Sequence, residues 1–148
     1  LKLEGTTVTD AGLTDVGKLT KLERLNVRGP TFTDVGVAAL KSLTNLTNLE
    51  LDDTLVSDDG FQQLSGLTKL RELFIRRTQI GDEGFGAMAN MSEMSRLLAR
   101  DTRLGDQGLA HLKGMTKLTI LDVSENVFGD EGVAHLSGLT SLETLNLW

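Results

Sequence analysis

The chain of 148 residues has no cysteine, one proline and one tryptophan, and only 4% of its residues are aromatic. The lack of cysteine excludes disulfide-bonded caps, cysteine zinc sites and thiol nucleophiles, and leaves the redox compartment open. No apolar run approaches the roughly eighteen residues that span a bilayer, and no basic, apolar, small-residue signal opens the chain. The sequence therefore predicts no membrane insertion, and it does not indicate a cellular location.

Positive charge is also scarce. The formal net charge is −6 and the pI is near 4.9, whereas a nonspecific nucleic-acid binder needs a basic face. No glycine-rich phosphate loop follows a suitable strand, and neither does a combination of nucleophile, base and oxyanion donor. We therefore predict no nucleic-acid partner, no cofactor and no enzymatic activity, and the acidic balance favours a protein partner.

What the chain does contain is a 24-residue repeat, without insertion or deletion. Its copies begin at Leu1, Leu25, Leu49, Leu73, Leu97 and Leu121, and Leu145 starts a seventh. A fixed period of this length predicts a solenoid whose repeats stack only on their neighbours. Positions one, three, eight, thirteen, sixteen, nineteen and twenty-two are apolar in all six full copies and form the predicted core. Residues 1–148 should make one domain.

Each repeat predicts a short strand followed by a short helix. Apolar residues at positions one and three flank an outward-pointing residue, as in a strand. An aspartate at position ten then precedes an apolar spacing of three, which predicts a helix with that aspartate as its N-cap. A glycine two residues later should let adjacent coils approach. Since helices are wider than strands, the solenoid should curve with its strands on the concave face. The aspartates are Asp10, Asp34, Asp58, Asp82, Asp106 and Asp130.

The repeat, best displayed by Leu121–Thr144, carries the motifs Thr-Asp-x-Gly-Leu at Thr9–Leu13 and Gly-Asp-x-Gly-Leu at Gly105–Leu109. It resembles the leucine-rich repeat, and most of all the bacterial 24-residue repeats of the planctomycete and GALA-like type. This resemblance implies an α/β fold, a right-handed horseshoe solenoid with a parallel concave sheet and short convex helices. It also implies a role in protein binding.

The sequence departs from the family pattern at position six. The family's asparagine occurs there only at Asn126, four other repeats have threonine, and Pro30 has no backbone donor. We therefore expect a threonine ladder in place of an asparagine ladder, and a locally irregular second repeat.

Three apolar residues fall at concave-face positions where the repeat needs none: Phe74, Leu98 and Ile120. We expect them to lie close together and to be exposed by the sheet. A contiguous exposed apolar patch usually marks an interaction site. Ordinary cross-strand packing of the sheet is the alternative.

Arginine is concentrated around this patch. Six of the eight arginines are Arg71, Arg76, Arg77, Arg96, Arg100 and Arg103. Arg76 and Arg100 occupy position four of adjacent strands and should form a costly like-charge pair unless an anion lies beside them. Asp52, Asp53 and Asp101 could supply that anion in a solvated ion-pair network. A partner's acidic residues or a bound anion could also supply it.

Other candidate chemistry is weak. His111 and His135 occur at the same position of adjacent repeats on the convex helices, and two ligands do not make a metal site. The group Asp52, Asp53, Asp58 and Asp59 could suggest calcium, but Asp58 is assigned to a helix start. Met88, Met91 and Met94 fall at core positions. We predict no metal site.

Together these observations predict a protein-interaction module whose concave face binds a partner through repeats three to six. The predicted contact residues are Phe74, Arg76, Arg96, Leu98, Arg100, Ile120 and Asp122. The alternative is a passive scaffold or spacer within a longer bacterial protein. Leu1 and Trp148 fall within predicted strands that lack polar capping repeats, so we also expect end-to-end self-association of the chain, with Trp148 on the concave side.

Overall fold

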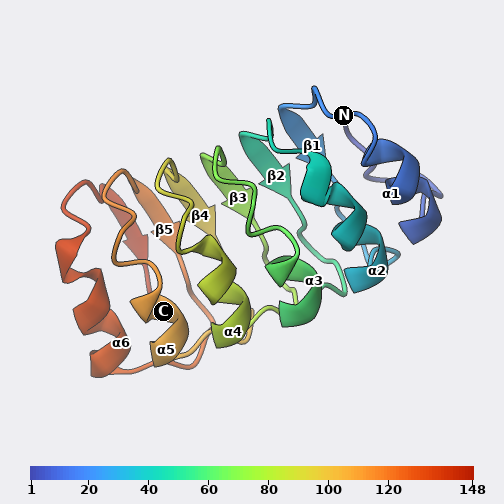
Figure 1. Cartoon of the computed structure of the whole chain (residues 1–148). Coiled ribbons are helices and arrows are strands. Elements are labelled where there is room, and N and C mark those ends of the chain that lie inside the picture. The colour runs from blue at the N-terminus through green and yellow to red at the C-terminus, as the bar shows by residue number, and fades with distance from the viewer.

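The computed structural model describes the whole chain as an open stack of coils, each contributing to a parallel sheet (Figure 1). The sheet has six strands in sequence order. The strands are β1 (Arg24–Asn26), β2 (Asn48–Glu50), β3 (Glu72–Phe74), β4 (Arg96–Leu98), β5 (Ile120–Asp122) and β6 (Thr144–Asn146). Lys2 of the first repeat forms only an isolated bridge to Asn26. Leu25, Leu49 and Leu73 pair across β1 to β3, so the sheet register follows the sequence repeat.

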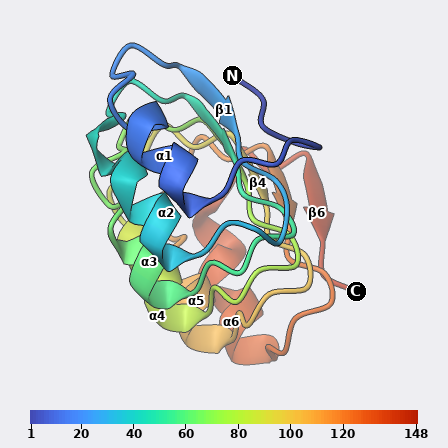
Figure 2. The same ribbon diagram turned by 90° about the vertical axis from the view of Figure 1, so that its right-hand side faces the viewer.

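The helices lie on the side of the stack opposite the sheet (Figure 2). They are α1 (Asp10–Val16), α2 (Asp34–Val37), α3 (Asp58–Gln62), α4 (Asp82–Phe85), α5 (Asp106–Ala110) and α6 (Asp130–Ala134). Three 3₁₀ segments extend the second, fourth and sixth repeats: η1 (Ala38–Ser42), η2 (Gly86–Met88) and η3 (His135–Gly138). Each α-helix begins at the repeated aspartate, so the predicted fold class and helix starts are confirmed.

The core runs between the sheet and the helices as one cluster of 36 buried apolar residues. Met88, Met91 and Met94 are fully buried in it, as predicted. Core positions lose their cover only in the terminal repeats, where Leu19 is 51% exposed and Leu145 is 41% exposed. A solenoid repeat buries its apolar side chains against its neighbours, so the outermost coils are covered on one side only.

The predicted role of the aspartates as N-caps of their own helices is wrong. The N-cap is the residue before each aspartate, and the carboxylate reaches the next repeat instead. Asp34 Oδ1 accepts a hydrogen bond from Ser57 N at 2.7 Å, and Asp34 Oδ2 accepts one from Ser57 Oγ at 2.6 Å. Asp58 Oδ1 likewise accepts from Gly81 N at 2.6 Å. The same bond recurs at Asp10, Asp82 and Asp106. These aspartates tie each helix start to the following one.

The glycine at position twelve leaves room for this carboxylate. A Cβ added to Gly60 would lie 2.2 Å from Asp34 Oδ1 and 2.7 Å from Asp34 Cα. Side-chain atoms do not approach backbone so closely, so any larger residue would push the two coils apart. The prediction that this glycine permits close approach of adjacent coils is confirmed.

The predicted threonine ladder is not formed. Thr54 Oγ1 donates to Leu51 O at 2.7 Å, within its own repeat, and Thr78 behaves in the same way. These hydroxyls therefore do not bond to one another from coil to coil. Asn126 does link two coils, because its amide donates to Ala99 O of the preceding repeat at 2.8 Å and its Oδ1 atom accepts from Thr102 Oγ1 at 2.8 Å. The irregular second repeat is observed as an unusual φ of 126° at Gly29, directly before Pro30.

Candidate protein-binding site on the concave face

The concave face carries the outward side chains of the strands and of the residues that follow them. Phe74 pairs with Leu98 across β3 and β4, and Arg96 pairs with Ile120 across β4 and β5. Phe74 and Leu98 are therefore direct cross-strand neighbours, and Ile120 lies on the next strand, diagonal to Leu98. They are half-buried, however, rather than fully exposed. Side chains on parallel strands about 4.8 Å apart cover one another, so sheet packing and an open apolar surface coexist here.

Arg96 covers part of this patch. Its guanidinium carbon lies 5.9 Å from the centroid of the Phe74 ring, within the range of a cation–π contact. Arg96 is exposed, and none of the seven ion pairs of the structure includes it.

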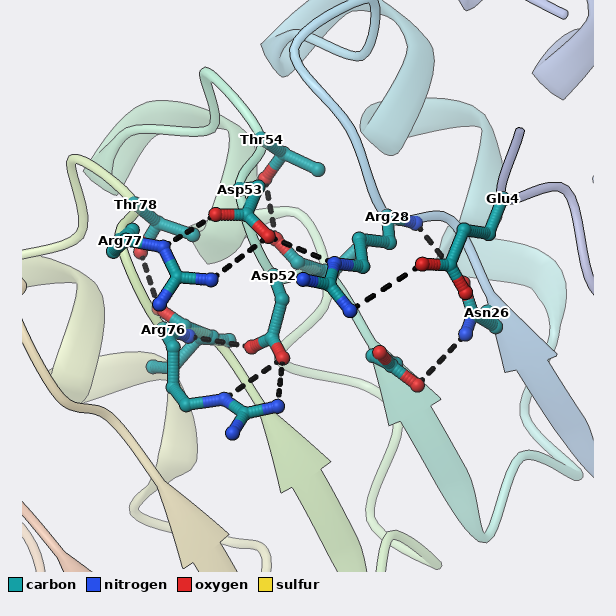
Figure 3. Close-up of polar contacts among 12 residues, drawn as sticks. Glu4, Asn26, Arg28, Asp52, Asp53, Thr54, Arg76, Arg77 and Thr78 are labelled. Carbon is teal, nitrogen blue, oxygen red and sulfur yellow. Dashed lines mark hydrogen bonds and ion pairs between the residues drawn. The ribbon is translucent and has the colours of Figure 1, made fainter. Parts of the chain in front are cut away.

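Arg76 is bound from within the chain. Asp52 is fully buried, and its carboxylate accepts bonds from Arg76 N at 2.7 Å, Nε at 2.8 Å and Nη2 at 2.5 Å (Figure 3). A buried carboxylate is tolerated only with such partners. The sequence placed Asp52 near the arginines but did not predict its burial at a concave-face position.

A second set of ion pairs runs along the edge of the face. Asp53 accepts bonds from Arg77 Nε at 2.5 Å and from Arg28 Nε at 2.8 Å, and Arg28 Nη1 also lies 3.3 Å from a Glu4 oxygen (Figure 3). The Arg77 hydrogen bond, aided by Arg28, holds the pKa of Asp53 below its usual value. Asp53 and Arg77 have left-handed φ angles of 61° and 53°. Both residues lie in the turns that follow the strands, and their side chains meet there, outside the sheet.

Arg100 does not share an anion with Arg76. Its Nη2 atom lies 2.6 Å from Glu125 Oε1, and this hydrogen bond lowers the pKa of Glu125. Asp101, which we expected to neutralise the two arginines, forms no ion pair. Arg76 pairs with Asp52, which was predicted, and Arg100 pairs with Glu125, which the sequence analysis missed. The internal ion-pair network is therefore present, with Glu125 in place of Asp101.

Trp148 extends the arginine and apolar region toward the last strand. The Arg100 guanidinium lies 4.9 Å from the Trp148 ring centroid, and Trp148 is 71% exposed. Ser124 occupies the same repeat position between them and is small and buried, so the two large side chains can meet above it. The prediction that Trp148 lies on the concave side is confirmed. Arg100, Ser124 and Trp148 all occupy position four of successive repeats, and a comparison of these positions in the sequence would have predicted the contact between Arg100 and Trp148.

Asp122, the last of the predicted contact residues, and Arg103, an arginine of the predicted cluster, occupy different surroundings. Asp122 lies beside Leu98 in the sheet, and its Oδ1 atom accepts bonds from Ser124 N at 3.1 Å and Oγ at 2.6 Å. Arg103 leaves the cluster, because its guanidinium reaches the side chain of Gln79 at 3.4 Å on the loop after the strand.

A hollow of about 360 Å³ marks the other half of the face and was not predicted. Asn26 and Glu50 line it, Asn26 Nδ2 donates to Glu50 Oε2 at 2.8 Å, and Phe74 lies at its far wall. Burial, and then the nearby charge of Asp52, raises the pKa of Glu50.

The candidate metal ligands named from the sequence do not gather into a cluster in the structure. No group of three or more His, Cys, Asp or Glu side chains could hold a metal ion. His111 lies exposed at the end of α5, and the Asp58 carboxylate is already bonded to the N–H groups of Gly81 and Gly84. None of the helices has the length and apolar character needed to cross a membrane.

The in-phase repeats, the single parallel sheet and the short opposing helices define a leucine-rich-repeat solenoid. A sequence model of the family described as Leucine Rich repeat matches residues 18–41, 66–89 and 114–137. The resemblance to leucine-rich repeats that the sequence analysis described is confirmed. A comparison with curated proteins found no match.

Solved structures of Listeria monocytogenes internalins are similar to this chain. Internalin C2 (inlC2) is 26% identical with a TM-score of 0.86, covering 99% of this chain and 60% of its own. Internalin inlF is 29% identical with a TM-score of 0.80, covering 88% of this chain and 36% of its own. The chain thus spans less than two thirds of either neighbour. Folds of this class are typically non-enzymatic scaffolds, and the repeats and neighbours support a protein-interaction module in general.

Proposed function

We propose that the chain binds a protein partner on its concave face, with β3 to β6 as the central contact region. The observation that carries this proposal is the group of concave-face residues Phe74, Leu98, Arg96, Arg100 and Trp148, in which Arg96 contacts the Phe74 ring and Arg100 contacts the Trp148 ring. The repeat needs none of these residues for its core. Aromatic and arginine side chains at the centre of an interface typically carry most of its binding energy.

Two arginines of the contact region already form ion pairs within the chain. Arg76 and Arg100 are held by Asp52 and Glu125, which fixes their side chains before a partner arrives. A side chain that is already ordered loses less conformational entropy on binding. Arg76 and Arg100 therefore serve as prearranged donors, and Ile120 and Asp122 form the adjoining sheet surface.

The alternative function is a passive scaffold. The internal pairing of Arg28, Arg76, Arg77 and Arg100 favours it, because these arginines do not require an outside anion. The two functions differ in what a concave-face substitution does. Binding should depend on these residues in the first case and be indifferent to them in the second.

The test is to isolate a protein partner with the wild-type chain and to measure its affinity for variants. Phe74→Ala and Arg100→Ala should each weaken binding by about 1–3 kcal/mol. His111→Ala, on the helical side, is the matched control and should leave affinity unchanged. Loss of the partner with His111→Ala, and full retention with the two concave-face variants, would refute the assignment.

We further propose end-to-end association of this polypeptide in solution. Leu1 and Leu145 are large apolar side chains left exposed at the two ends of the stack, and β6 presents an unpaired sheet edge that can pair with another chain. Light scattering at high protein concentration should detect the association, and a strictly monomeric species would contradict it.

A further inference from the structure

Arg96 differs from the other arginines of the proposed contact region. Arg76 lies 2.5 Å from Asp52 and Arg100 lies 2.6 Å from Glu125. Arg96 has only the Phe74 ring, at 5.9 Å. A cation–π contact uses the face of the guanidinium group and leaves its N–H edge free. Arg96 can therefore donate hydrogen bonds to an outside group without breaking an existing ion pair.

The nearest acidic candidate within the chain is turned elsewhere. Glu72 is the cross-strand neighbour of Arg96. Its Oε2 atom instead accepts a hydrogen bond from Asn48 Nδ2 at 2.7 Å, in the strand on its other side. The same arrangement, two positions along the repeat and on the preceding pair of strands, pairs Asn26 with Glu50. The sheet thus commits its glutamates to asparagines and leaves the Arg96 charge without an internal counter-ion.

The surroundings of Arg96 favour one kind of outside group. Its neighbours Phe74, Leu98 and Ile120 are half-buried apolar side chains. A partner that covers them removes water from the guanidinium, and a charge left without a counter-ion in such a place is costly. A carboxylate matches the planar fork of arginine through two parallel hydrogen bonds.

Building on the proposed function, we propose that the partner segment places an aspartate or glutamate carboxylate on Arg96 and a neighbouring apolar side chain on Phe74 and Leu98. The acidic balance of the whole chain, −6, does not oppose this contact at short range, since exposed charges more than about 10 Å apart are largely screened at physiological salt. The partner is therefore a protein with an exposed segment that combines acidic and apolar residues.

The experiment uses a random-peptide display library, selected in parallel on the wild-type chain, Phe74→Ala, Arg96→Gln and Arg103→Gln. Arg103 is an exposed arginine outside the patch, so its variant controls for the loss of one positive charge. Individual peptides are then compared with twins in which Asp and Glu are replaced by Asn and Gln. Circular dichroism verifies that each variant is folded.

Peptides selected on the wild type and on Arg103→Gln should depend on Phe74 and be enriched in Asp and Glu. Their amide twins should bind about tenfold more weakly, the effect of one charge-assisted hydrogen bond, and this preference should disappear on Arg96→Gln. Phe74-dependent peptides without an acidic preference, or with one that Arg96→Gln retains, would overturn the inference and leave the proposed function standing. A library that yields no Phe74-dependent peptide would contradict both.

Discussion

The loops that start the helices and the concave face of the sheet use charged residues in opposite ways. At the helix starts the same aspartate recurs in every repeat, and in the first five repeats it makes the same bond to the next coil, as Asp34 does with Ser57 and Asp58 with Gly81. On the concave face the residues change from repeat to repeat, and their contacts change with them. Arg76 grips a buried aspartate, whereas Arg96 rests on an aromatic ring.

This difference separates residues that hold the stack together from residues that are free to serve a partner. A contact that every coil must make allows little variation, because a solenoid is stabilised by its repeat-to-repeat interfaces. A surface that no coil needs can vary. Substitutions at the helix starts should therefore alter stability, and substitutions on the concave face should alter binding.

The largest expected effect is at the glycine that receives the aspartate. Gly60→Ala should destabilise the fold by about 3 kcal/mol, because the new Cβ would overlap Asp34 and force adjacent coils apart. Gly66 has open space around the position of an added Cβ, so Gly66→Ala should be neutral or stabilising by up to about 1 kcal/mol. Urea denaturation of both variants measures the contrast. Equal losses would show that coil spacing does not depend on position twelve.

The second-largest loss of stability should come from removing the aspartate carboxylate that bonds to the next repeat. Asp34→Ala leaves two donors of Ser57 without their acceptor and should cost about 2 kcal/mol. Asp130 begins the last helix and has no following helix start to bind. Asp130→Ala removes the negative charge at the helix start, as Asp34→Ala does, but it breaks no hydrogen bond between repeats. It should therefore cost well under 1 kcal/mol. Thermal unfolding of the pair compares them directly, and a similar loss in both would favour an ordinary capping role.

A smaller effect is expected from the edge ion pairs, and it should depend on pH. Asp53→Asn keeps a residue that tolerates the left-handed backbone and should cost less than about 1 kcal/mol at pH 7, as for a partly exposed pair. Because the folded-state pKa of Asp53 is lowered, its contribution is present above the ordinary value of 3.8 and is lost as pH falls through the lowered pKa. The gap in Tm between wild type and variant should close in acid. A constant gap would exclude the ion pair as its cause.

The contribution of Glu50 to stability should depend on pH in the opposite direction to that of Asp53. Its folded-state pKa is raised, so ionisation at neutral pH disfavours the folded state, and stability is regained as pH falls through the raised pKa toward the ordinary value of 4.5. Glu50→Gln keeps an acceptor for Asn26 and should unfold at the same or a slightly higher temperature than wild type at pH 7. The same pH series in Tm measures it, and a clear loss of stability at pH 7 would contradict this assignment.

The sequence predicted what the repeat imposes and missed what depends on individual side-chain reach. The strand and helix positions and the buried methionines follow from the apolar period, and all were confirmed. The inter-repeat role of the aspartates was missed, because a carboxylate before a helix has the same pattern whether it caps its own helix or the next one. The burial of Asp52 and the pairing of Glu125 with Arg100 also could not be predicted, since an ion pair depends on rotamers that spacing does not specify.

The central claim, that a partner binds on the concave face near β3 to β6, can be tested through the chain's single tryptophan. Trp148 is 71% exposed and contacts Arg100 on that face, so its fluorescence reports from the proposed contact region. In a titration with a tryptophan-free segment of the partner, we expect a saturable change in Trp148 emission together with reduced quenching by acrylamide. Saturated binding, established by calorimetry, with unchanged emission and unchanged quenching would place the partner elsewhere and contradict the account.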